Sequence, residues 1–158
     1  MDRALFVAME DRPATRELLR EAGELAAGVG AELIVLSIIK EDDYAEKSVS
    51  RADLGETDGT GEQYSGYSID QAEGDAKNQA ERLAVESFEG LDLEWRGLGA
   101  VGQPERTVLE VADEEDVDHL FVLGRRRSPS GKAIFGDLAQ HLVIDFEGPV
   151  TTFLPRDQ

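Results

Sequence analysis

Positive charge is concentrated in one short segment of this acidic chain. Residues 123–137 read LGRRRSPSGKAIFGD. They carry four cationic side chains within eight residues: Arg125, Arg126, Arg127 and Lys132. Arginine can hold a phosphate through two parallel hydrogen bonds, so this segment predicts a site for an anion, most simply a phosphate. The alternative is that these cations form ion pairs with the chain's own abundant acids or with a second subunit.

Small polar residues in the same segment would complete such a site. Ser128 and Ser130 supply hydroxyls, and Gly131 supplies an adaptable backbone. Neither serine has a paired base, so nucleophilic catalysis has no support. The Gly-Lys pair is followed by alanine and lacks the upstream GxxxxG spacing, so the segment is not a P-loop.

Two acids, Glu10 and Asp11, follow the first predicted strand and would face the same crevice. They could contact a ribose hydroxyl or hold a metal through the phosphates, or they could be solvated acids at the start of a helix. His119 and His141 have no partner at metal-binding or catalytic spacing, so we expect them in surface or packing roles.

The composition indicates where the protein works. The chain of 158 residues has 34 acidic and 16 basic side chains, and its formal net charge is −18. Only four of the basic side chains are lysine. Self-repulsion at this charge destabilises a compact chain unless salt screens it, so the pattern predicts the cytoplasm of a halophile. The alternative is an ordinary acidic protein with a basic or metal partner. Nucleic-acid binding is not expected, because the summed field repels phosphate.

The chain is expected to be a soluble cytoplasmic protein with one domain over residues 1–158. It has no cysteine, which excludes disulfides and thiolate chemistry. No apolar run approaches the roughly 20 residues needed to cross a bilayer, so no membrane association is expected. The apolar run at the N-terminus is followed closely by acids, which indicates a strand rather than a signal peptide.

Apolar runs and helical periods alternate along the chain. The runs predict strands at residues 3–8, 31–39, 91–98, 119–123 and 150–154. Helical periodicity predicts four helices: at residues 13–27, after Ser68 as N-cap, after Pro104, and at residues 137–144. Gly28 and Gly30 are expected to end the first of them. Residues 41–67 are acidic, rich in glycine and without a clear period. They predict an inserted loop, either mobile or folded over a site as a lid.

This alternation predicts an α/β fold, a parallel sheet with helices on both faces. Such sheets bind ligands beyond the carboxyl ends of their strands, where the strand order reverses. The arginine-rich segment directly follows the fourth predicted strand and is therefore expected at that edge.

The ordered motifs of the chain resemble the universal stress protein family, of the adenine nucleotide α-hydrolase-like superfamily and of haloarchaeal type. The motifs are VAME followed by DRPAT, LIVLSII, GQPERTVLEVADEEDVDHLFVLG and GKAIFGDLAQHLVIDFEGPVTTF. The resemblance implies a Rossmann-like, doubly wound three-layer sandwich with a five-stranded parallel sheet in the order 3-2-1-4-5. It also implies a homodimer through Val150–Leu154, because the last strand pairs across a two-fold axis in the family.

Family members that bind ATP carry a loop of the form G-x2-G-x9-G-[ST], whose amides and final hydroxyl hold the phosphates. Gly124 matches the first glycine and Gly136 the last. Arg127 stands in place of the second glycine, one residue is missing before Gly136, and Asp137 replaces the Ser or Thr. An aspartate there would place negative charge beside the phosphate, and it is more simply read as a helix cap.

The resemblance implies a non-catalytic stress-response or regulatory module that binds ATP or AMP, with or without Mg²⁺, in this modified loop and alters a surface seen by an unidentified protein partner. Two alternatives stay open: a dimeric interaction module that binds no nucleotide, and a weak ATP hydrolase. Glu10 stands where many binders have Asp, and Ile38 where they have a small aliphatic residue beside the adenine. The candidate binding residues are Ala8, Glu10, Ile38, Gly124, Arg125, Arg126, Arg127, Ser130, Gly131, Gly136 and Asp137.

Overall fold

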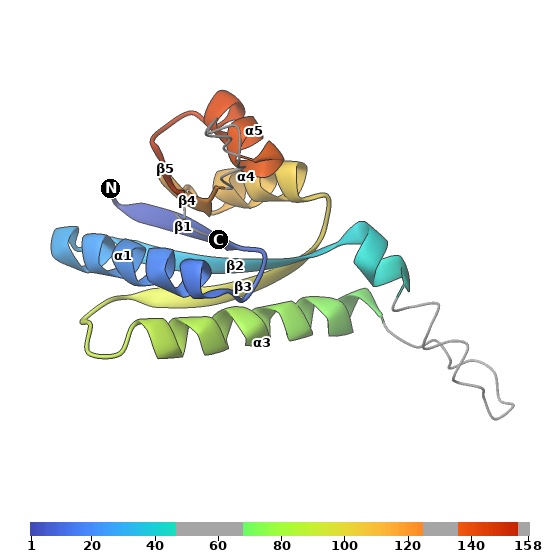
Figure 1. Cartoon of the computed structure of the whole chain (residues 1–158), viewed down its shortest axis with the longest axis horizontal. Helices are drawn as coiled ribbons and strands as arrows, with labels where there is room; N and C mark the ends of the chain where they lie inside the picture. Colours follow the sequence, from blue (N-terminus) through green and yellow to red (C-terminus); the bar gives the residue numbers. More distant parts are fainter. Residues whose placement is uncertain (47–67, 125–135, 155–158) are drawn as a thin grey trace, which may run out of the picture.

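A five-stranded parallel sheet forms the centre of the protein (Figure 1). The computed structural model describes residues 1–46, 68–124 and 136–154. The sheet has the order β3-β2-β1-β4-β5, which confirms the predicted α/β fold and strand order. Its strands are β1 (Arg3–Ala8), β2 (Glu32–Lys40), β3 (Trp95–Gly102), β4 (His119–Leu123) and β5 (Val150–Phe153).

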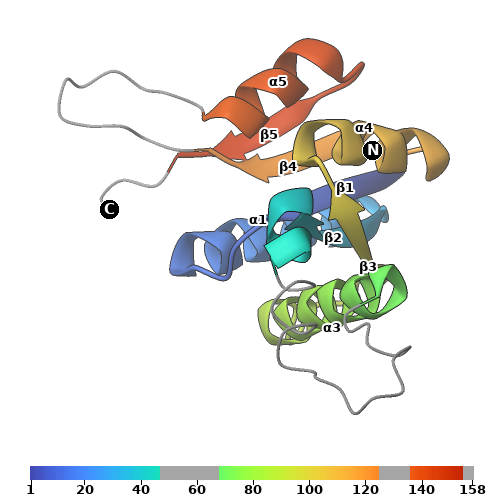
Figure 2. The ribbon, with the colours of Figure 1, turned by 90° about the vertical axis from the view of Figure 1, so that its right-hand side faces the viewer.

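Helices cover both faces of the sheet (Figure 2). Helices α1 (Pro13–Val29) and α3 (Ile69–Ser87) pack on one face, and α4 (Pro104–Glu114) and α5 (Asp137–Asp145) on the other. This is the three-layer arrangement expected of a doubly wound sheet. Residues 41–46 are also helical, where the sequence predicted a loop. The rest of that segment, residues 47–67, lies outside the described residues.

The core lies on both faces of the central strands. Along β1, Phe6 packs toward α1 and α3, whereas Leu5 and Val7 pack toward α4 and α5. Phe6 and Leu5 are fully buried. Burying a side chain of this size contributes roughly 1.5–3 kcal/mol, so a strand buried on both faces is well anchored. Its carboxyl end is therefore a rigid base for whatever follows it.

Strand β3 begins later than the predicted strand at residues 91–98, and that prediction was wrong in its bounds. The prediction stopped short of residues 99–102, GAVG, because their glycines resemble a turn. These glycines have a packing role instead. A Cβ at Gly99 would fall against backbone atoms of Glu73 and Lys77, so α3 packs directly on the backbone of β3. The alanines of α3 allow the same close approach.

Helix ends follow the predicted chemistry with two corrections. Ser68 caps α3 as predicted: its hydroxyl accepts from the Gln71 amide at 3.1 Å. Helix α1 passes through Gly28 and ends at Gly30, whose φ of 75° suits glycine. The N-cap of α5 is Gly136 rather than Asp137, because Gly136 has the non-helical φ of 89° and Asp137 is already helical.

Among the described residues, no helix has both the length and the apolar character needed to span a membrane.

Candidate nucleotide-binding cleft

A cleft of about 470 Å³ lies at the carboxyl edge of the sheet, where β1 and β4 are neighbours. The chain leaves β1 toward β2 on one side and β4 toward β5 on the other, so this is the point where strand order reverses. Its lining residues are Val7, Met9, Glu10, Arg12, Thr15, Lys40, Asp43, Pro104, Glu105, Val122, Leu123, Gly124, Gly136, Asp137, Leu138 and Ala139.

The β1 side of the cleft is held by the start of α1. Glu10 follows β1 and forms an exposed ion pair with Arg12, with 3.2 Å between its Oε1 and the arginine Nε. Thr15 lies one turn into α1 and is buried. Its hydroxyl accepts from the Arg12 amide at 3.4 Å. A carboxylate, a guanidinium and a hydroxyl therefore stand together at the end of a buried strand.

The β4 side is shaped by glycine. Gly124 continues the sheet pairing beyond β4, since its amide donates to the Phe153 carbonyl at 2.9 Å. Gly136 has φ 89° and ψ 158°, a backbone region that is open essentially to glycine alone. This conformation starts α5 at the cleft, with Asp137 as the first helical residue. The two ends of the arginine-rich segment, Gly124 and Gly136, thus meet in one cavity.

Helices α4 and α5 begin at the cleft without a side-chain cap. The N-cap residues of α4 and α5 are Gln103 and Gly136, and neither side chain caps its helix. In α3, which begins away from the cleft, Ser68 and Gln71 cap reciprocally. Uncapped helix starts present amide N–H groups and the positive end of the helix dipole. Each therefore favours an anion at the cleft.

Several cleft residues escaped prediction from the sequence. No motif marked Arg12, Lys40, Asp43 and Glu105. Their shared signal is position: Lys40 is the last residue of β2, and the other three lie in the loops or first helical turns that follow the carboxyl ends of strands. With Glu10 and Asp137 they give the described lining four carboxylates and two cations. An anionic ligand would therefore need further positive charge.

A model of the Usp family, described as the universal stress protein family, matches residues 1–153. This chain belongs to the universal stress protein family. No curated protein matches it. The family match confirms the resemblance to universal stress proteins, and the strand order confirms the fold that this resemblance implied.

Solved universal stress proteins share the fold at low sequence identity. A protein from Lactobacillus plantarum has 15% identity and a TM-score of 0.68, with 96% of this chain and 97% of that chain covered. A universal stress protein in complex with cAMP has 15% identity and a TM-score of 0.61, with 97% and 96% covered. One from Archaeoglobus fulgidus in complex with dAMP has 16% identity and a TM-score of 0.58, with 96% and 97% covered.

The predicted site residues of this universal stress protein fall into three groups. Glu10, Gly124, Gly136 and Asp137 line the cleft together. Ala8 and Ile38 are buried but do not line it: Ala8 packs in the core toward α1, and Ile38 in the core toward α4 and α5. The remaining candidates lie outside the described residues: Arg125, Arg126, Arg127, Ser130 and Gly131.

The other chemically capable residues of the universal stress protein have structural partners. Asp11 is held by Arg16 through two hydrogen bonds of 3.0 Å, and the hydrogen bonding lowers the pKa of Asp11 below its usual value. His119 stacks on Phe121 and lies 2.9 Å from the Thr151 hydroxyl, and its burial lowers its pKa. These contacts match the packing role expected of His119. Of the two acids that follow β1, only Glu10 lines the cleft.

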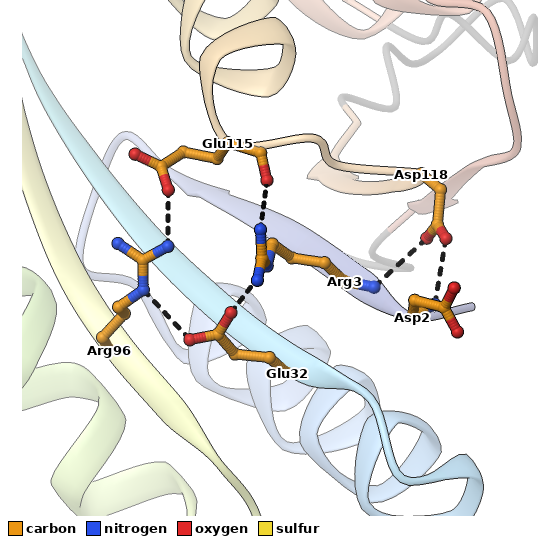
Figure 3. A network of polar contacts seen from close by, with 6 residues as sticks. All are labelled: Asp2, Arg3, Glu32, Arg96, Glu115 and Asp118. Atoms are coloured by element: carbon orange, nitrogen blue, oxygen red, sulfur yellow. Dashed lines mark hydrogen bonds and ion pairs between the residues drawn. The ribbon is translucent and has the colours of Figure 1, made fainter.

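An ionic network closes the opposite, amino edge of the sheet (Figure 3). Glu32 accepts from Arg3 at 2.7 Å and from Arg96 at 3.0 Å. Arg96 also pairs with Glu115 at 2.5 Å, and Arg3 donates to the Glu115 carbonyl at 2.6 Å. Burial alone would raise the pKa of Glu32, but the hydrogen bonds and charges of Arg96 and Arg3 outweigh it and lower that pKa. The network joins the starts of β1, β2 and β3 to the end of α4.

Proposed function

We propose that this universal stress protein binds an adenine nucleotide, ATP or AMP, in the cleft at the carboxyl edge of its sheet. The observation that carries the proposal is the meeting of Glu10, Gly124 and Gly136 in one cavity at the point where strand order reverses. Nucleotides bind parallel α/β sheets at that point. The related proteins in complex with cAMP and dAMP support the choice of an adenine nucleotide.

Each part of the nucleotide has a counterpart in the cleft. The uncapped starts of α4 and α5 favour the phosphate. The Glu10 carboxylate can accept a hydrogen bond from a ribose hydroxyl once its exposed ion pair with Arg12 is broken. The apolar side chains of Val7, Met9 and Leu138 offer a surface for the base.

The phosphate also needs positive charge, because acids outnumber cations in the described lining. We assign this role to Arg125, Arg126 and Arg127, which follow Gly124 in the sequence. The described residues contain no cluster of three or more His, Cys, Asp or Glu that could hold a metal ion. A Mg²⁺ ion would therefore take most of its oxygen ligands from the nucleotide and water, with at most one or two carboxylates from the protein.

We assign the protein a regulatory rather than a catalytic role. The position that supplies a Ser or Thr hydroxyl in ATP-binding relatives is Asp137 here, and its carboxylate lies at the start of α5. A negative group at that position opposes the charge that builds up on a transferring phosphoryl group. We therefore expect binding without turnover.

Isothermal titration of the full chain in high KCl tests the proposal. AMP or ATP should bind with about one site per chain, and the variant R125Q/R126Q/R127Q should lose about tenfold or more in affinity, since hydrogen bonds to charged groups contribute roughly 1.5–3 kcal/mol each. Arg106→Gln is the control, because Arg106 lies outside the cleft and its pair with Glu110 is exposed. Absence of binding by the unmodified chain would refute the nucleotide proposal.

We further propose that the protein forms a homodimer through Val150–Leu154. Strand β5 is an edge of the described sheet and pairs only with β4 there, and all of its residues are partly exposed. An edge strand with free backbone groups is suited to pairing with its own copy across a two-fold axis. Light scattering after gel filtration should give twice the 17.3 kDa mass of one chain, and Thr152→Pro should shift the protein to the monomer.

We also propose that the protein comes from a halophile's cytoplasm. The net charge of −18 must be screened for the chain to stay compact, and at about 1 M salt the screening length falls to about 3 Å. The midpoint of thermal unfolding should therefore rise steadily between about 0.1 M and 2 M KCl. A midpoint that does not change over this range would contradict the halophile assignment.

A further inference from the structure

A second cavity lies outside the nucleotide cleft, in the groove between α4 and α5. It has a volume of about 640 Å³. Its lining residues are Gln103, Glu105, Arg106, Leu109, Glu110, Asp113 and His141. The two helices pack side by side on one face of the sheet (Figure 2). Glu105 lines both cavities, which places the groove beside the cleft.

One large apolar side chain lines the groove, and an exposed one lies a helical turn further along α5. Leu109 lines the groove and packs on the core below it. Ile144 follows His141 by three residues on α5, which makes the two neighbours on the helix surface. Ile144 is 70% exposed, the largest exposure among the large hydrophobic side chains of the described residues. Apolar surface at a groove of this kind is typical of a contact site for another polypeptide.

The charges around the groove are mainly acidic. Glu105, Glu110 and Asp113 line it, against the single arginine Arg106. The pair between Arg106 and Glu110 is long, at 3.9 Å, and both side chains are 61% exposed. Such a pair is weak, so a stronger cationic partner can replace it. The groove therefore offers a ligand three carboxylates along its α4 wall.

We propose that the α4–α5 groove docks a basic amphipathic segment of a partner protein. An apolar side chain of the segment packs on Leu109 and Ile144, and its Lys or Arg side chains pair with Glu110 and Asp113. Charge complementarity selects a basic segment over an acidic one, and the apolar contact distinguishes this groove from the rest of an acidic surface. The surface does not depend on the nucleotide proposal, because none of these contacts uses the cleft.

The test uses a fluorescent model peptide of about 16 residues, with leucines along one helical face and lysines on the other. Fluorescence anisotropy measures its binding to the full chain at about 0.15 M and 1 M KCl. Glu110→Gln with Asp113→Asn should weaken binding about fivefold or more at the lower salt. Ile144→Ser should weaken it about threefold or more at both salts, because apolar contact is not screened.

Matched controls lie on the other face of the sheet. Glu17→Gln with Glu21→Gln removes the same charge from α1, and Val85→Ser removes a side chain that is 63% exposed on α3. Both controls should bind within about twofold of the unmodified chain, as expected for surface changes far from the contact. Equal losses in groove and control variants would mean that the total charge attracts the peptide, and would overturn the proposal.

Amide chemical shifts of the unmodified chain provide a measurement independent of any variant. On addition of the peptide, the shifted amides should cluster in residues 103–114 and 137–145, which form the two walls of the groove. A peptide with glutamate in place of every lysine should cause no such shifts. Shifts spread over α1 and α3 instead, or no binding of the basic peptide, would also overturn the proposal.

Discussion

The substitution Gly99→Ala tests the close packing of α3 on β3. An ideal Cβ at Gly99 would lie 2.9 Å from the Cβ of Ala76 and would also meet the Glu73 carbonyl and the Lys77 amide. Backbone atoms of a helix cannot rotate away as the end of a side chain can, so the whole of α3 must shift. Overpacking typically costs 1–3 kcal/mol. Because the obstructing atoms are backbone, we expect about 3 kcal/mol.

Chemical denaturation at constant KCl measures this loss. The free energy of unfolding of Gly99→Ala should fall by about 3 kcal/mol, which corresponds to a midpoint of thermal unfolding lower by roughly 6–12 °C for a chain of this size. Gly74→Ala is the control: it lies in α3, has open space around its added Cβ, and should stabilise the chain by about 0.5–1 kcal/mol.

The comparison between the two alanine variants decides the matter. A Gly99→Ala variant as stable as the unmodified chain would show that α3 does not touch the backbone of β3. It would also refute the assignment of GLGAVG to a strand whose glycines are selected by packing.

Further predictions concern the ionic network, the cleft and the absence of turnover. In the folded protein the pKa of Glu32 lies below its ordinary value of 4.5, so the stability that Glu32 contributes is complete above that pH and is lost as the pH falls through the folded-state pKa. Glu32→Gln should therefore lower the free energy of unfolding by about 1–3 kcal/mol at pH 7, and by less near pH 3, in urea titrations at both pH values. Gly136→Ala should cost about 1–3 kcal/mol, because φ 89° suits only glycine, and should weaken AMP binding in the same titration that measures the unmodified chain. Phosphate release from ATP should not exceed that of a buffer blank, and release that Glu10→Gln abolishes would revive the hydrolase alternative.

The sequence predicted the order of the elements well, because their signals are strong and local. The continuous apolar run of β2 predicts a strand that is covered on both faces, and most of its residues are buried in the structure. Ser68 marked the start of α3 by its capping chemistry alone. Such features depend on residues that are close in the sequence, so the sequence alone is enough to predict them.

Features set by distant neighbours could not be predicted in the same way. The bounds of β3 depend on α3, which packs against Gly97 and Gly99 and makes a strand of residues that resemble a turn. Arg12 and Lys40 reach the cleft only because β1 and β2 end at the same edge. Their roles follow from the topology rather than from any local pattern.

Whether the chain holds an adenine nucleotide can be tested by identifying what the purified protein carries. The protein is prepared in about 2 M KCl, a salt that screens its charge. Heat then releases any bound small molecule for mass spectrometry. We expect an adenine nucleotide at close to one per chain or, for a chain that has lost its ligand, a higher midpoint of thermal unfolding on addition of AMP or ATP. A chain that carries no nucleotide and whose midpoint changes with neither would refute nucleotide binding.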